Sequence, residues 1–344
     1  MTIRSMLFTA LLFTLVLTPV HAAPAPIGLF TIVDGDVVVV REAHSFAAAE
    51  GVSLLDQDIV RSREGTRLAR IELDDGTLLD LGPSTELLLQ PHAVLAGAEG
   101  GSAVYLLRGW LKVTTAAANG PTAVGLTTPR IGVARLAGSM VMAVQPQSSL
   151  AFVETGHADA LERGGAKPGT AQALNDGDAF VLRAAAPAML ARRPPADLLE
   201  GMPRAFADTL PRRAARWSAR RVEPTTFDTP SHADLSGWLH AEPAVRMSLV
   251  KRFAPLAREA RFRASLVAEL RSLPEWGRVL FPDKYRSKTT ETAHVRGSTT
   301  PLTSRTQGPA RKANGMLAPP IVERSSDVSA VSAALAQAPR TETP

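Results

Sequence analysis

Residues 70–84 read RIELDDGTLLDLGPS, and this stretch decides the fold class. Apolar side chains alternate with polar ones on both sides of an Asp-Gly pair, at Ile71, Leu73, Leu79 and Leu81. Period-two alternation around Asp75-Gly76 predicts a β-hairpin, because both residues tolerate the positive φ that a tight turn demands. Pro83 lacks a backbone donor and ends the second strand. We expect Leu73 to lie on the buried face of this hairpin.

A similar strand-like sequence pattern extends from residue 26 to about residue 186. Short runs of Val, Ile and Leu are separated by Gly, Asp and Asn at regular intervals. This spacing is typical of a β-sandwich, a β-barrel or a short β-solenoid. No helical period of ten to fifteen residues separates the strands, which disfavours a parallel βαβ fold. The sequence therefore predicts a mainly β domain over residues 26–186.

The composition changes after this domain. Residues 187–232 are rich in Arg and Pro and are expected to form a basic linker. Residues 233–285 show a helical period, and Pro255 should end or bend a helix there. This helical region is too small to bury much surface alone, so it should pack on the β domain or on a partner. Residues 286–344 are rich in Ser, Thr, Pro and Arg, and we expect a disordered tail.

The N-terminus has the features of a secretory signal. Residues 1–22 contain Arg4, an apolar run and small residues before the expected cleavage site. An uncleaved anchor is the alternative, although the run is short for a membrane span. The chain has no Cys, which excludes disulfides. Its formal net charge of +5 does not by itself indicate nucleic acid binding. We expect a periplasmic or secreted protein with no later membrane segment.

Several short segments, in order, resemble the FecR domain, a periplasmic β-rich module of bacterial envelope signalling. The residues that carry the resemblance are Gly35-Asp36-Val37-Val38-Val39, Asp58-Ile59-Val60-Arg61-Ser62, Asp75-Gly76-Thr77, Arg108-Gly109, Thr128-Pro129, Gly138-Ser139 and Asp176-Gly177-Asp178. Gln57 and Ala137 depart from the family pattern. The resemblance covers slightly less than half of the chain.

The resemblance implies a FecR-like β-sandwich or short β-solenoid. Family members that regulate sigma factors carry a cytoplasmic anti-sigma region and a membrane helix before this domain. The sequence shows neither, so we expect a stand-alone exported module that does not control a sigma factor directly.

Two groups of residues are candidates for partner binding. An all-β module can bind an extended segment along an uncovered sheet edge, and the strand after Pro129 is the expected edge, because Pro marks an edge or a strand start. The resemblance adds three neighbouring candidates, so the first group is Thr128, Pro129, Gly138 and Ser139. The second group is a basic cluster around Trp217, formed by Arg212, Arg213, Arg216, Arg220 and Arg221.

The basic cluster has three interpretations. It can be a solvated face beside a linker, a surface attracted to anionic lipid or cell-wall polymer, or a nucleic acid site. The last is disfavoured because an exported protein rarely meets nucleic acid. Trp217 fits either an interfacial helix or a buried anchor.

The sequence gives no pattern for catalysis, a metal or a cofactor. The clusters at residues 34–36, 74–76 and 176–178 lack the spaced carboxylates of a calcium loop and are predicted to be turns. Gly138-Ser139 is not part of a nucleophile elbow, and the seven His residues show no metal-binding spacing.

The function expected from the sequence is therefore non-catalytic. It is an exported FecR-like binding or signalling module that engages another envelope protein, with no cofactor. The alternative is an envelope ligand module that holds glycan or anionic polymer through the basic cluster.

Overall fold

The structure is a computed structural model that describes residues 24–90, 103–116, 124–164, 169–217, 220 and 222–285. The expected signal peptide (residues 1–22), the expected disordered tail (residues 286–344) and Arg221 of the basic cluster lie outside the described residues.

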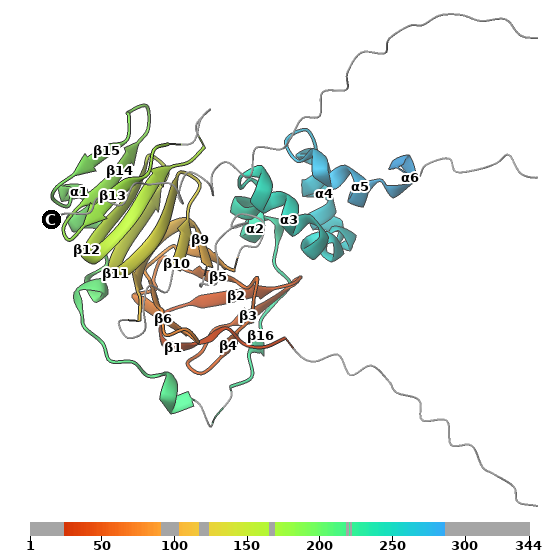
Figure 1. Ribbon diagram of the computed structural model, residues 1–344. Coiled ribbons are helices and arrows are strands. Elements are labelled where there is room, and N and C mark those ends of the chain that lie inside the picture. Colours follow the sequence, from red (N-terminus) through yellow and green to blue (C-terminus); the bar gives the residue numbers. More distant parts are fainter. Residues whose placement is uncertain are drawn as a thin grey trace, which may run out of the picture.

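The described chain is mainly β, with helices gathered toward its C-terminal part, as predicted (Figure 1). The first strands are β1 (Gly28–Asp34), β2 (Val37–Arg41), β3 (His44–Ala47), β4 (Ser53–Leu54), β5 (Ile59–Ser62), β6 (Leu68–Leu73), β7 (Leu78–Leu81) and β8 (Glu86–Leu89). The next are β9 (Ala103–Thr114), β10 (Val124–Thr127), β11 (Ile131–Gln145), β12 (Ser148–Glu162), β13 (Gln172–Asn175), β14 (Ala179–Arg183) and β15 (Met189–Ala191).

Helices and one further short strand follow. They are α1 (Ala196–Gly201), the 3-10 helices η1 (Arg204–Ala207) and η2 (Ala214–Trp217), strand β16 (Thr225–Thr226), α2 (His232–Leu239), α3 (Pro243–Phe253), η3 (Ala254–Arg258), α4 (Ala260–Ala268), η4 (Pro274–Trp276), α5 (Gly277–Leu280) and α6 (Pro282–Tyr285).

The predicted hairpin is present as β6 and β7, which pair antiparallel with Ile71 opposite Leu79. Ile71, Leu73 and Leu79 all lie in the main core. The turn is closed by the Gly76 N–H, which donates to the Leu73 carbonyl at 2.9 Å. Gly76 has a φ of +83°, but Asp75 does not share this left-handed conformation. The turn therefore needs a positive φ only at the glycine.

The strands form one sheet whose main path is β15-β14-β12-β11-β10-β9-β8-β5-β2-β3-β16. The strand pairs are antiparallel, except that β10 runs parallel to β9. β1, β6 and β7 form a side branch that rejoins the path at β9. The sheet bends around one central core, which takes apolar side chains from near both ends of the main path, such as Val39 on β2 and Phe180 on β14, and from Phe30 on the side branch.

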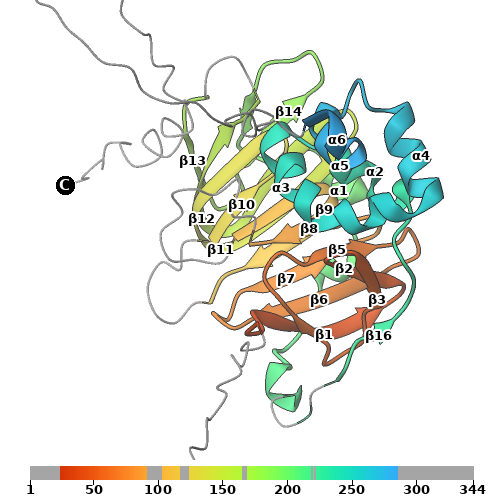
Figure 2. The same cartoon turned by 90° about the vertical axis from the view of Figure 1, so that its right-hand side faces the viewer.

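The C-terminal helices cover the outer face of β2, β5, β8 and the first half of β9 (Figure 2). Val40, Ile59 and Tyr105 from these strands share a second core cluster with Trp238 and Phe253 from the helices. The rings of Tyr105 and Trp238 are 6.2 Å apart between centroids. Burial of these large side chains fixes the helices to the sheet. The prediction that the helical region packs on the β domain or on a partner is thus confirmed for the β domain.

The proline break in the helical region is also confirmed. α3 ends at Phe253, and Pro255 lies in the 3-10 helix η3 that follows. The next helix, α4, buries Phe262 and Leu266 but ends at Ala268, so Leu273 lies beyond it and still reaches the core.

Residues 187–232 are not a free linker. The β domain continues to β15, which pairs with β14, and residues 203–217, 220 and 222–226 then run around the outside of the sheet (Figure 1). We call these described residues the strap. At its start, Phe206 is buried with Trp110 and Val141 in a third core cluster. At its end, Thr225 pairs with Ala47 of β3.

The strap covers buried charges on the outer face of the hairpin. Arg70 and Asp80 form a two-bond ion pair at 2.6 and 2.7 Å, and Arg70 also donates to the Leu210 carbonyl. The Glu72 carboxylate accepts hydrogen bonds from the Arg213 and Ala214 backbone N–H groups. These charged side chains therefore satisfy backbone groups of a segment whose regular elements are all short.

In the part of the chain that the structure describes, no helix has both the length and the apolar character needed to cross a membrane.

Replacing Leu73 with Asp should destabilise the β domain by several kcal/mol, because Leu73 is 5% exposed and a buried carboxylate there has no partner. Thermal and urea unfolding of the variant measure this loss. Leu73→Met keeps an apolar side chain of similar volume and should cost less than about 1.5 kcal/mol. A Leu73→Asp variant with wild-type unfolding would contradict the assignment of Leu73 to the core.

Candidate functional site

Strand β11, which follows Pro129, lies inside the sheet. It pairs with β12 along most of its length and with β9 and β10 on its other side. The prediction that this strand offers an edge for strand addition was therefore wrong. Pro129 lies in the turn between β10 and β11, just before β11 begins. Proline is common in turns and just before strands, so its presence here does not require an edge strand.

Thr128 is buried and holds this turn together. Its Oγ1 accepts a hydrogen bond from the Ile131 N–H at 2.8 Å. Its carbonyl accepts from Arg163, whose guanidinium forms two hydrogen bonds of 3.1 and 3.2 Å with the Glu242 carboxylate, directly before α3. The turn is therefore linked to the helical region of this same chain.

Gly138 lies where β11 and β12 approach most closely. It is opposite Gly156, and both have a positive φ. A Cβ atom on Gly138 would lie 2.0 Å from the Thr155 carbonyl oxygen, which no real structure allows. The next residue, Ser139, is 8% exposed and donates to Glu154 at 2.8 Å. This geometry gives Gly138 and Ser139 a role in strand packing.

The basic cluster is divided between contacts with the sheet and solvent. Arg212 donates to the Gly76 carbonyl, and the Arg213 backbone binds Glu72 as described above. Trp217 packs so closely on Gly51 that a Cβ there would lie 2.5 Å from the indole ring. Trp217 thus contacts the sheet at Gly51 but stays half-buried, so it is not the fully buried anchor of one interpretation. Arg216 and Arg220 are exposed.

A cleft of about 490 Å³ is lined by residues of β2, β5, β8 and β9 and of the segments that flank them. We call it the charged cleft. It is lined by Asp36, Val38, Arg61, Ser62, Arg63, Glu64, Gly65, Ser84, Glu86 and Arg108. Three of these side chains are cationic, three are acidic, and Val38 is apolar.

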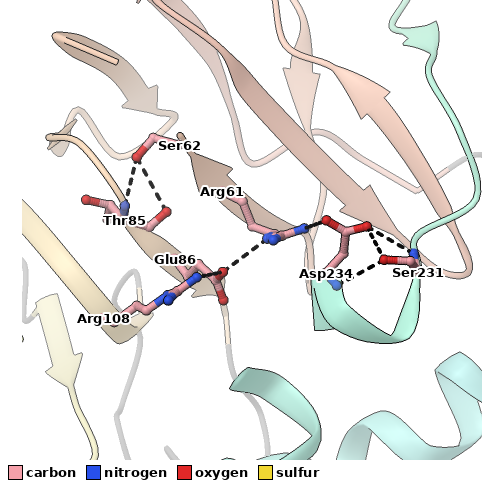
Figure 3. Close-up of polar contacts among 7 residues, drawn as sticks. All are labelled: Arg61, Ser62, Thr85, Glu86, Arg108, Ser231 and Asp234. Carbon is pink, nitrogen blue, oxygen red and sulfur yellow. Dashed lines mark hydrogen bonds and ion pairs between the residues drawn. The ribbon is translucent and has the colours of Figure 1, made fainter. Parts of the chain in front are cut away.

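Glu86 is the centre of the cleft's ion pairs (Figure 3). Its carboxylate is 3% exposed, and Oε1 accepts from Arg61 Nε at 3.1 Å and from Arg108 Nη2 at 2.7 Å. Arg61 also reaches Asp234 of α2 through Nη1 at 3.1 Å. A carboxylate this buried is stable only when cations compensate it. The network therefore fixes the directions of Arg61 and Arg108 and joins the sheet to α2.

Asp234 belongs to the network and to the N-terminus of α2. It forms a capping box with Ser231, in which the Ser231 Oγ accepts from the Asp234 N–H and the Asp234 carboxylate accepts from the Ser231 N–H. Burial alone would raise the pKa of Asp234, but the hydrogen bonds from Ser231 and Arg61 outweigh it and hold the pKa below the usual value.

The backbone around the cleft is shaped by Thr85 and Gly109. Thr85 Oγ1 donates to the Trp110 carbonyl and accepts from the Trp110 N–H, while Ser62 Oγ accepts from the Thr85 N–H. Gly109 has a φ of +98°, and a Cβ on it would lie 2.4 Å from Thr85 Cα. This bend within β9 places Arg108 on the cleft next to Glu86.

Among the residues that the structure describes, no group of three or more His, Asp or Glu side chains could hold a metal ion. The clusters at residues 74–76 and 176–178 form turns, as predicted. In the second turn, the Asp178 carboxylate accepts from the Asn175 N–H at 3.0 Å.

No protein-family model matches this chain, and no curated protein sequence matches it. Two crystal structures of a candidate anti-sigma factor from Parabacteroides distasonis ATCC 8503, at 2.50 and 1.65 Å resolution, are similar to part of it. They align over 39% of this chain and 59% of theirs, at 14% and 13% identity and a TM-score of 0.32. A TM-score of this size does not establish a shared fold.

Gly138→Ala should destabilise the protein by about 3 kcal/mol or more, because it combines an unfavourable φ with a backbone clash. Gly177→Ala is the matched control. Gly177 also has a positive φ, but nothing lies within 4 Å of its Cβ position, so the cost should be about 1–2 kcal/mol. Urea unfolding measures both. Equal losses of unfolding free energy in the two variants would show that the close approach of the strands at Gly138 adds nothing to the cost of the substitution.

Asp234→Asn should lower the free energy of unfolding by about 1 kcal/mol at pH 7, the size expected for a helix cap with a partly exposed ion pair. The pKa of Asp234 is lowered in the folded state, so its ionised form stabilises the fold above the unfolded value of 3.8. This contribution is lost as the pH falls below 3.8 and through the folded-state pKa.

The difference in free energy of unfolding between wild type and Asp234→Asn should therefore shrink as the pH falls from 5 to 2.5, as measured by urea unfolding. Asp208→Asn, at an exposed position of the strap, is the control and should show little difference at any pH. A difference that stayed constant with pH would contradict the role of the Asp234 charge.

Proposed function

We propose that this chain is an exported, non-catalytic binding module of the bacterial envelope, of the FecR type, and that it engages another envelope protein at the charged cleft. The ordered FecR-like segments and the secretory signal pattern of residues 1–22 support the location and the module type.

The backbone supports the resemblance at particular positions. Gly76, Gly109 and Gly138 stand in three different FecR-like segments, and all three have a positive φ. A β-branched or larger residue at such positions would be strained. At these three positions of the FecR-like segments, the backbone conformation favours glycine.

The single observation that carries the proposal is the make-up of the charged cleft. Pockets for small organic ligands are mostly lined by apolar and aromatic side chains. This cleft instead presents charges of both signs, and Arg61 and Arg108 are held in place by the buried Glu86. Fixed charges of both signs favour recognition of a polar protein surface, because they give orientation and specificity.

The Ser62 hydroxyl supports a role in binding rather than catalysis. Ser62 Oγ donates to the Gly82 carbonyl at 2.6 Å and accepts from the Thr85 N–H at 2.9 Å. A serine nucleophile needs a base within hydrogen-bond reach, and Ser62 has backbone partners instead.

The envelope-polymer alternative rests on the basic cluster. Arg212 donates to the Gly76 carbonyl and the Arg213 backbone donates to Glu72, so this part of the cluster is held against the hairpin. The described residues of the cluster have no partly buried ion-pair network comparable to the one that fixes Arg61 and Arg108 in the charged cleft. We therefore favour the protein partner.

Site-specific crosslinking tests this proposal. Arg63 lines the cleft and is exposed, so a photo-crosslinking residue such as p-benzoylphenylalanine at this position reports on what binds there. The matched control carries the same residue at Arg271, which is exposed in the helical region and does not line the cleft. The tagged variants are expressed in the native bacterium, irradiated, fractionated and analysed by mass spectrometry.

We expect one recurrent envelope protein attached at position 63 and not at position 271. Attachment of glycan strands alone would favour the alternative function. Identical products at both positions, or a mature chain in the cytoplasmic fraction, would overturn the proposal.

A further inference from the structure

A second cleft, of about 570 Å³, lies within the helical region. We call it the basic cleft. Its charged lining residues are Lys251, Arg258 and Arg263, and its apolar ones include Ala254, Pro255 and Val279. No acidic residue lines it.

Local sequence explains why cations gather here. Lys251 lies in the last turn of α3, where the negative end of the helix dipole stabilises a positive charge. Pro255 then breaks the helix, and the chain continues as η3. Arg258, which lies seven residues after Lys251, therefore lines the same cleft as Lys251. Arg263 comes from the next helix, α4.

Arg263 is fixed in position. Its Nη2 donates to the Leu280 carbonyl, and its guanidinium carbon lies 5.8 Å from the centre of the Phe281 ring. Lys284 Nζ lies 4.7 Å from the centre of the same ring. Two cations thus share one aromatic ring, and of these two Arg263 lines the cleft.

Most carboxylates of the helical region pair elsewhere. Four of them have partners away from the cleft: Asp234 with Arg61, Glu242 with Arg163, Glu269 with His232 and His240, and Glu275 with Arg246. In the described part of the chain, Lys251 and Arg258 form no ion pair and no side-chain hydrogen bond. Glu259, next to Arg258 in the sequence, is exposed and does not line the cleft. Among the described residues, the positive charges of Lys251 and Arg258 are therefore not compensated by an ion pair.

We infer that the basic cleft binds a phosphate group carried on an organic molecule. Arg offers paired N–H donors that match the oxygens of a phosphate, and Lys adds a mobile point charge. The apolar residues Ala254, Pro255 and Val279 can contact the part of the ligand that carries the phosphate. This inference is independent of the proposed function, because the basic cleft and the charged cleft share no residue.

The test uses the purified full chain and a double variant, Lys251→Gln with Arg258→Gln. Both side chains are exposed, so their replacement should leave the fold intact, which circular dichroism and thermal unfolding verify. The control is Arg261→Gln with Arg271→Gln, which removes the same charge from exposed positions outside the cleft. The probes are inorganic phosphate and glycerol phosphate, measured by calorimetry, and vesicles of phosphatidylglycerol or phosphatidylcholine, measured by sedimentation.

We expect the cleft variant to lose at least tenfold in affinity for glycerol phosphate or for phosphatidylglycerol vesicles, and the control variant to change less than twofold. Binding of glycerol phosphate in solution would identify a free phosphate ester as the ligand. Binding of phosphatidylglycerol vesicles alone would identify a lipid headgroup.

Equal losses in the two variants would mean unspecific charge attraction and would overturn the inference, as would no binding of any probe by the wild-type chain. An Arg263→Lys variant checks the role of the guanidinium, because it keeps the charge but loses the paired donors. It should also weaken phosphate binding. The crosslinking result at position 63 is unaffected by any of these outcomes, so the two proposals fail separately.

Discussion

The structure depends on the bend of β9 at Gly109. The first half of this strand pairs with β8 and β10, and the second half pairs with β7 and β11. One strand can serve both parts of the sheet only if it changes direction, and the close approach of Thr85 leaves no room for a side chain at the bend. The same bend brings Arg108 to Glu86 and so creates one wall of the charged cleft.

A sheet that bends around one core still has an outer face to cover. The chain covers one part with helices, through apolar contacts such as Tyr105 with Trp238. It covers another part with the strap, through charged contacts such as Glu72 with the strap backbone. The charged cleft lies where the helical cover begins, and its ion pair from Arg61 to Asp234 is also part of the attachment of α2. Arg61 therefore both attaches α2 to the sheet and lines the candidate binding surface.

The sequence predicted the mainly β fold, the hairpin at residues 70–84 and the break at Pro255, because each depends on local pattern or on the chemistry of Gly and Pro. It failed for the strand after Pro129 and for the strap. The pairing of β11 with β9 and the strap partners of Glu72 are set by residues distant in the chain, which no local pattern contains. For the charged cleft, Arg61 and Arg108 stood in FecR-like segments, but their convergence on Glu86 required the tertiary fold.

The contacts that attach α3 to the sheet also bear on folding kinetics. Arg252 donates to the Val40 carbonyl at 2.7 Å, across a sequence separation of 212 residues. The outer face of β2 therefore stays open until the chain has been synthesised at least through α3. Such distant contacts raise the contact order and slow the final folding step. A chain that emerges N-terminus first would expose apolar side chains such as Val40 and Ile59 for that whole interval, so holding by a chaperone would protect it from aggregation.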